Sequence, residues 1–133
     1  ITGPGDLYTS NIAAMLPVGI QEAIAKSSAT IVYVAGNKYS IGGEPAPRTL
    51  SERVRALEEC FPRPVDVVMY DSHVLTHQQQ LRYAQQQWGL IEFDVAQINN
   101  RQVIGIDLES EGGGIDARKL GEALYSQIIM GKR

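Results

Sequence analysis

The 133-residue chain holds a single cysteine, Cys60, so it cannot form an internal disulfide bond, and this usage fits a reducing compartment. It has no apolar run near the roughly 20 residues that a membrane-spanning helix needs. Basic residues number 12 against 15 acidic ones, and no basic stripe interleaved with aromatic residues occurs. We therefore expect a cytoplasmic protein whose partners include neither a membrane nor nucleic acid.

What the chain does have is a regular alternation of strand-like and helix-like segments. Apolar, β-branched runs predict strands, and apolar residues at helical spacing predict helices between them. No repeat or linker divides the chain. Because each parallel strand step needs a crossover, the alternation predicts a single α/β domain over residues 1–133, a Rossmann-like three-layer sandwich with a mostly parallel sheet. The strands are expected at 29–36, 64–71, 90–94 and 102–109, and the helices at 12–25, 49–61, 76–88 and after residue 116.

Several helix starts carry local signals. Thr49 is followed three residues later by Glu52, which predicts a capping box. Asp116 is expected to cap the last helix, and Pro17 to lie in the first turn of the main part of the first one. The intervening stretch 37–48 contains two glycines and two prolines and is predicted to be a long loop.

The first candidate site is the loop "GPGDLYTSN" at residues 3–11. Gly3 and Gly5 would let the backbone turn tightly and approach a ligand closely. Thr9 and Ser10 offer hydroxyls near a helix N-terminus, where the dipole favours a phosphate. The alternative is that these residues only cap the helix and shape the turn, and the negative charge of Asp6 counts against a phosphate.

The second candidate site is the loop at 37–48. Asn37, Ser40, Glu44 and Arg48 are polar groups that could converge on a sugar hydroxyl or a base edge. The alternative is an ordinary solvated loop.

No catalytic or metal-binding arrangement stands out. His73 and His77 have the spacing of a helical zinc pair, but no third ligand accompanies them. Cys60 is expected to be a buried small hydrophobe. The residues alone therefore predict no metal, no cofactor and no catalytic group.

At the two loops the chain resembles one family. The segment "GPGDLYTSNIAAMLPVGIQEAI" is similar to "GPGSLYTSxxPNLLVPGIxEAI" of the gluconeogenesis-factor (YvcK-like) proteins, which are related to the CofD phospholactate transferases. Downstream, the family shows an Asn, a further residue three positions later, a Gly-Glu pair and a Thr. This chain has residues in the same register without a gap. Here they are Asn37, Ser40, Gly43, Glu44 and Thr49.

The resemblance implies that the chain corresponds to the C-terminal half of a larger unit. The family's glycine-rich GGGTG loop and its "DDGGSSGRLR"-type segment belong to the other half. The resemblance also implies uridine nucleotide sugars as ligands in the YvcK-like branch, and deazaflavin substrates with Mg²⁺ in the transferase branch. The ligand-binding residues expected here are Gly3, Gly5, Tyr8, Thr9, Ser10, Asn37, Ser40, Glu44 and Arg48.

Departures from the family pattern leave the ligand open. Asp6 replaces a Ser, Arg48 replaces an aromatic residue, and Glu52–Arg53 replaces an acid–His pair. We expect a module that binds a nucleotide or nucleotide sugar and is not catalytic alone. The alternative is a self-associating structural or interaction protein. A homo-oligomer is expected in either case, because a half-domain leaves a sheet edge and an apolar face uncovered.

Overall fold

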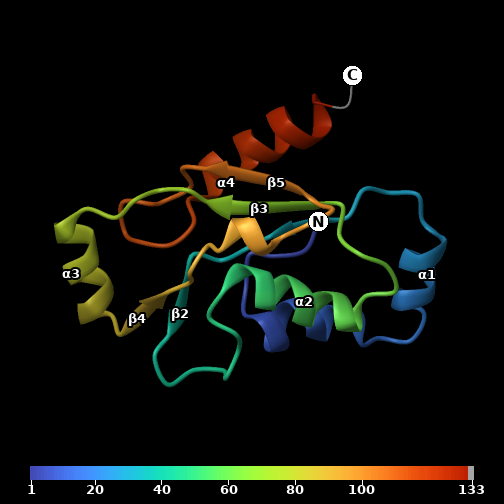
Figure 1. Cartoon of the computed structure of the whole chain (residues 1–133), viewed down its shortest axis with the longest axis horizontal. Helices are drawn as coiled ribbons and strands as arrows, with labels where there is room; N and C mark the ends of the chain where they lie inside the picture. The colour runs from blue at the N-terminus through green and yellow to red at the C-terminus, as the bar shows by residue number, and fades with distance from the viewer. Residues whose placement is uncertain (132–133) are drawn as a thin grey trace.

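The computed structural model describes residues 1–131 and is built on a parallel sheet. Its strands are β1 (Val32–Val34), β3 (Val67–Asp71) and β5 (Gln102–Ile106), in the order β1-β3-β5 (Figure 1). On the outer side of β1, Thr2 pairs in parallel with Tyr33 through two backbone hydrogen bonds of 2.9 Å. The residues just before the GPG loop therefore extend the sheet beyond β1.

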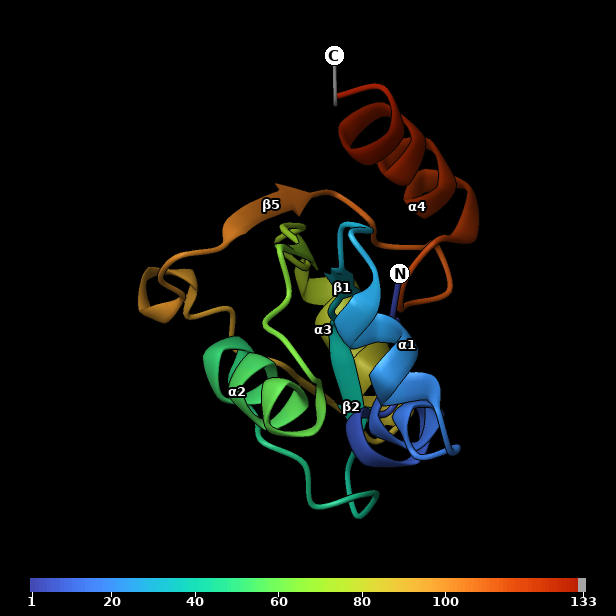
Figure 2. The same cartoon turned by 90° about the vertical axis from the view of Figure 1, so that its right-hand side faces the viewer.

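Helices cover both faces of this sheet. Figure 2 shows α2 (Leu50–Cys60) and α4 (Ala117–Leu124) on opposite sides of it. One core, under α2 and the π-helical segment η1 (Leu7–Ile12), contains Leu7, Tyr33, Leu50, Leu57 and Val68. The other, under α4 and its continuation η4 (Tyr125–Ile129), contains Val32, Val34, Met69, Leu108 and Ala123. The predicted three-layer α/β sandwich is confirmed, because adjacent strand residues point to opposite cores.

A smaller antiparallel ribbon joins β2 (Lys38–Ser40) to β4 (Trp88–Leu90), beside α3 (His77–Gln85). The remaining elements are short: η2 (Ala13–Met15), α1 (Ile20–Lys26) and η3 (Val95–Gln97). Within residues 1–131, no helix combines the length and the apolar character needed to cross a bilayer.

Thr49 and Asp116 cap their helices as predicted, but the full capping box is not formed, because the Glu52 carboxylate accepts from the Thr49 hydroxyl and not from its N–H. Pro17 lies before α1 and not in its first turn. The Thr49 side chain accepts from the Glu52 N–H at 3.4 Å, and Asp116 accepts from the Lys119 N–H at 2.8 Å. The continuous helix expected at 12–25 is wrong. The chain turns after Met15, and α1 begins only at Ile20, because Gly19 adopts a left-handed backbone with φ of 88°.

Two strand boundaries also differ from expectation. The predicted loop at 37–48 contains β2, and the strand expected at 90–94 is instead β4, which ends at Leu90. Both differences have one cause. β2 and β4 pair with each other across about fifty residues of chain, and local patterns carry no information on such pairing.

Candidate functional site

A depression of 310 Å³ lies where the Thr2 segment and β1 end. In open α/β sheets, ligands bind at the carboxyl ends of the strands, so this position is the expected one for a site. Its lining comes from the GPG loop, the segment after β1, helix α2 and the turn before α4. The residues are Pro4, Gly5, Asp6, Gly36, Asn37, Lys38, Arg53 and Ile115.

The GPG loop lies directly against the end of β1. Gly3 has a φ of 81°, and a Cβ added to it would lie 2.2 Å from the carbonyl oxygen of Val34. The Gly3–Pro4 peptide bond is cis. The buried Asn11 amide donates to the carbonyls of Gly5 and Asp6 at 3.0 and 3.1 Å, which holds the loop on the start of η1. Only glycine fits at position 3, because both the backbone angle and the contact exclude a side chain.

The second candidate loop reaches the first through Glu44. Its carboxylate accepts from the backbone N–H groups of Leu7 at 2.5 Å, Tyr8 at 3.2 Å and Thr9 at 3.3 Å. The Thr9 hydroxyl also donates to it at 3.4 Å. The N–H groups at the start of η1, which the sequence suggested for a phosphate, are thus bonded to a carboxylate of the chain itself. The free N–H groups at a helix start favour a negative group, and here that group is the Glu44 carboxylate.

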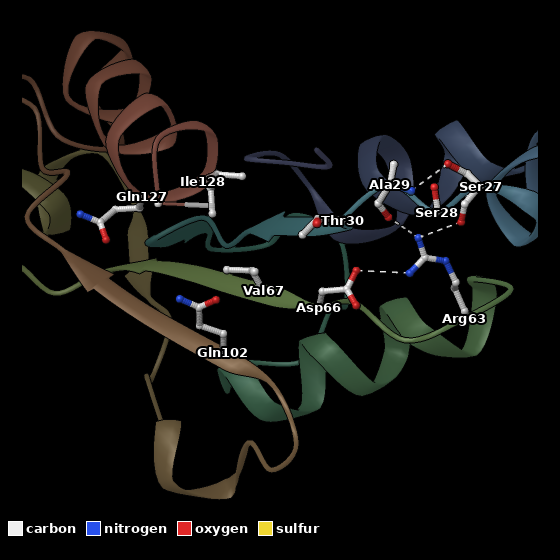
Figure 3. A pocket seen from close by; sticks show the side chains of 11 residues that line it. Ser27, Ser28, Ala29, Thr30, Arg63, Asp66, Val67, Gln102, Gln127 and Ile128 are labelled. Atoms are coloured by element: carbon white, nitrogen blue, oxygen red, sulfur yellow. Dashed lines mark hydrogen bonds and ion pairs between the residues drawn. The ribbon is translucent and has the colours of Figure 1, made fainter. Parts of the chain in front are cut away.

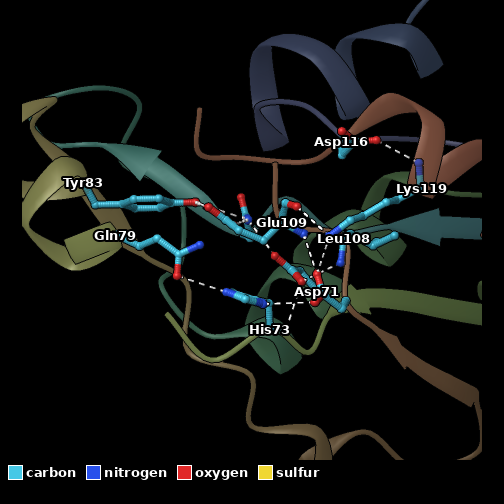
Figure 4. A network of polar contacts seen from close by, with 10 residues as sticks. Asp71, His73, Gln79, Tyr83, Leu108, Glu109, Asp116 and Lys119 are labelled. Atoms are coloured by element: carbon cyan, nitrogen blue, oxygen red, sulfur yellow. Dashed lines mark hydrogen bonds and ion pairs between the residues drawn. The ribbon is translucent and has the colours of Figure 1, made fainter. Parts of the chain in front are cut away.

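Beside the depression, Asn37 bridges two buried acids. Its side-chain nitrogen donates to Asp71 at 2.8 Å and to Glu109 at 2.7 Å. The Tyr83 hydroxyl donates to Glu109 at 2.8 Å, as Figure 4 shows. Burial raises the pKa of Glu109, and the charge of Asp71 adds to that rise. Burial is also the main reason that the pKa of Tyr83 is raised to about 12.

The same network continues to the protein surface. His73 places one ring nitrogen 3.1 Å from Gln79 (Figure 4). Its other ring nitrogen lies 3.1 Å from Asp107. Lys119 donates to Asp107 and to the carbonyl oxygen of Glu109, both at 2.8 Å. His73 precedes α3 and His77 begins it, so the two do not face each other along a helix. Among residues 1–131, no group of three or more His, Cys, Asp or Glu side chains is placed to hold a metal ion.

The structure brings some of the expected site residues together and separates others. Gly5 and Asn37 line the depression and Gly3 packs against the Val34 carbonyl, whereas Tyr8 and Thr9 contact Glu44. The Ser10 side chain lies under Gly5, where a Cβ on Gly5 would lie 3.1 Å from its own.

Ser40 and Arg48 do not line the depression. Ser40 lies in β2, opposite Trp88. The Arg48 guanidinium stacks 3.6 Å above the ring of Tyr39.

Sequence reasoning did not select three charged residues near the site: Lys38, Asp71 and Glu109. It marked Arg53 only as a departure from the family pattern. Asp71 and Glu109 end two of the predicted strands, and this shared position was a usable signal, since parallel strands end at the same edge. Lys38 had no comparable signal. Lys38 follows Asn37, and its ammonium lies 2.8 Å from the centre of the Trp88 ring.

A larger depression of 590 Å³ lies at the opposite end of the strands (Figure 3). Arg63 donates there to the carbonyls of Ser27 and Ala29 and forms an ion pair with Asp66 at 3.2 Å. These bonds join α2's end to the segment before β1, so this cation already has internal partners.

Known proteins similar to this chain fall in one group. The chain is 34% identical over 100 residues to a putative gluconeogenesis factor of Thermotoga maritima, covering 75% of this chain and 32% of that protein. It is 36% identical over 109 residues to the one of Nostoc sp., covering 78% and 24%. The chain thus spans a third or less of the length of these relatives.

A solved structure and a family model agree with these relatives. The crystal structure of a UPF0052 family member from Bacillus halodurans superposes with a TM-score of 0.81 at 26% identity, covering 92% of this chain and 41% of that one. The family model described as 2-phospho-L-lactate transferase CofD matches residues 1–109, which include both loops, Arg53 and the two buried acids. With its parallel sheet, its GPG loop and these matches in agreement, the chain belongs to the CofD family.

Proposed function

We propose that this chain binds a phosphate-bearing ligand, a nucleotide or a nucleotide sugar, in the depression beside the GPG loop. The observation that carries this proposal is the meeting of Gly5 and Asn37 at the carboxyl ends of the parallel strands, with Lys38 and Arg53 in the same lining. Glycine permits close approach of a ligand to the backbone, and two cations favour a phosphate. Asp6, in the same lining, opposes a bare anion and favours a ligand that also carries hydroxyl donors.

We further propose that the chain alone binds without turnover. Group transfer from a phosphorylated substrate depends on several positioned groups and on metal-assisted charge neutralisation. The chain spans only 32% and 24% of the two relatives described above. The two acids nearest the depression, Asp71 and Glu109, are both bonded to Asn37 and lie buried. Both carboxylates therefore already have hydrogen-bond partners within the fold.

Titration calorimetry with UDP and UDP-glucose, each with and without Mg²⁺, tests the proposal. We expect weak binding that does not depend on Mg²⁺ and no transfer to a deazaflavin acceptor. Lys38→Met should weaken binding, because it removes a cation from the lining. Lys26→Met is the matched control, since Lys26 is an exposed lysine that pairs with Glu22 on its own helix, away from the depression. The absence of heat with both nucleotides would refute ligand binding, and tight Mg²⁺-dependent binding or measurable transfer would refute the lack of turnover.

Self-association is the second candidate, and an apolar cleft supports it. A cavity of 170 Å³ lies at the edge where Thr2 pairs with β1, and Ile1, Met15, Ile24 and Phe61 line it. Ile1 is 72% exposed, although it lies beside a paired strand. Covering this edge with a second copy would bury apolar surface, and stable homodimers bury more than ~1,200 Å². Sizing chromatography with light scattering should show a dimer, whereas a monomer mass at tens of micromolar protein would exclude it.

A further inference from the structure

Arg53 is a buried cation without an acidic partner. Its residue is 3% exposed, and it lies in the first turns of α2. Its Nε donates to the carbonyl oxygen of Pro47 at 2.8 Å. In the part of the chain that the structure describes, the ion pairs involve other residues, and no Asp or Glu pairs with Arg53.

A guanidinium in this position is costly unless an anion accompanies it. Charge that leaves water without a counter-charge loses solvation that a single carbonyl does not replace. The nearby Tyr33 hydroxyl is also buried, and among residues 1–131 it has no hydrogen-bond partner. Burial raises the pKa of Tyr33, and the charge of Arg53 offsets part of that rise. The interior next to Arg53 therefore contains one buried hydroxyl that the fold leaves without a hydrogen bond.

Arg53 also faces the depression rather than the protein core alone. It lines that cavity together with Gly5, Asn37 and Lys38. The other anion-binding position nearby is closed, because Glu44 already accepts from the N–H groups of Leu7, Tyr8 and Thr9. An incoming phosphoryl group therefore finds its free donors at Arg53, not at the start of η1.

We propose that Arg53 is the residue that recognises the phosphoryl group of the ligand, with its two terminal nitrogens donating to the phosphoryl oxygens. The planar fork of a guanidinium matches two oxygens of one phosphoryl group, which an ammonium cannot do. The inference rests on the proposed function for the position of the ligand. It adds that the diphosphate, more than the nucleoside, supplies the affinity, and that Arg53 determines this preference.

The test uses the whole chain and four variants. Arg53→Met removes the charge, Arg53→Lys keeps the charge without the fork, and Arg53→Gln keeps a donor for the carbonyl of Pro47. Arg55→Met is the matched control, because it removes a positive charge from an exposed position of the same helix. Circular dichroism checks that each variant folds. Binding of pyrophosphate, UDP and uridine is measured by calorimetry at constant ionic strength.

We expect Arg55→Met to bind pyrophosphate and UDP as tightly as wild type does, and both chains to bind uridine far more weakly. Arg53→Met and Arg53→Gln should weaken the binding of pyrophosphate and UDP about tenfold or more. The affinity of Arg53→Lys should lie between that of wild type and that of these two variants. Pyrophosphate should also raise the melting temperature of wild type but not of Arg53→Met.

The outcomes separate this inference from the proposed function. Binding of UDP that is unchanged in the folded Arg53 variants would overturn the role of Arg53 while leaving ligand binding intact. Binding of pyrophosphate at least as tight as that of UDP, and lost in Arg53→Met, would support Arg53 while refuting recognition of a nucleotide. A wild-type chain that binds neither pyrophosphate nor UDP would overturn both.

Discussion

Asn37 and Glu109 lie 72 residues apart in the chain, yet the Asn37 amide nitrogen lies 2.7 Å from the Glu109 carboxylate. The same nitrogen donates to Asp71, so one amide group separates two buried acids, one at the end of β3 and the other in the segment after β5. Each carboxylate receives another donor, from Tyr83 in one case and the Leu108 N–H in the other. Asn37 therefore links the loop after β1 to the other two strands of the sheet.

Replacing Asn37 by alanine should destabilise the fold by about 2–4 kcal/mol, because two buried carboxylates would lose the donor between them. Urea unfolding monitored by circular dichroism measures the change. Asn99→Ala, at an exposed position, is the control and should have little effect. A loss for Asn37→Ala no larger than that of the control would show that the bridge adds nothing to stability.

Replacing Gly3 by alanine should cost about 2 kcal/mol more than replacing Gly42. Both glycines have a φ of 81°, so both variants carry the strain of a left-handed backbone, about 1 kcal/mol. Only Gly3 adds a contact, because its new Cβ would lie 2.2 Å from the Val34 carbonyl oxygen, whereas nothing lies within 4 Å at Gly42. Thermal unfolding of the two variants compares them, and equal losses would mean that the loop can move away from β1.

Glu44→Ala should destabilise the protein by about 1 kcal/mol, the usual effect of removing a helix cap. Glu44→Gln should lose less, because it keeps one acceptor for the N–H groups of Leu7, Tyr8 and Thr9. Hydrogen exchange at these three amides gives a local readout and should quicken in Glu44→Ala. The control is Glu111→Ala in an exposed turn. Unchanged exchange in Glu44→Ala would show that these amides are protected in some other way.

His73 should stabilise the fold more at acidic than at alkaline pH. Its hydrogen bond to Gln79 and then its contacts with Asp107 raise its pKa above 6.5, against the opposing effect of burial. A raised pKa in the folded state means that the stabilisation is complete below the unfolded pKa and is lost as the pH rises through the folded pKa. The stability difference between wild type and His73→Asn should thus shrink from about pH 5.5 to about pH 8.5. His77→Asn is the control, and a difference that grows over this range would contradict the assignment.

Local spacing in the sequence was enough to predict much of the fold. Thr49 and Glu52 lie three residues apart, as do Asp116 and Lys119, so their capping bonds depend on only one turn of chain. The alternation of segments likewise predicted the parallel sheet, because a crossover leaves few other arrangements. The GPG loop and the register from Asn37 to Thr49 indicated the family, and the match over residues 1–109 confirmed it.

The tertiary structure alone decided which polar groups meet. Glu44 reaches Thr9 across 35 residues, and Asn37 reaches Asp71 across 34. The sequence marked Arg53 only as a departure from the family pattern, whereas the packing of α2 against the GPG loop buries it and turns it toward the depression. No local pattern encodes these contacts, because each depends on where the crossovers return the chain. The sequence by itself therefore determined the elements and the family, whereas the burial and partners of each charge, on which the proposed site depends, followed from the packed layers.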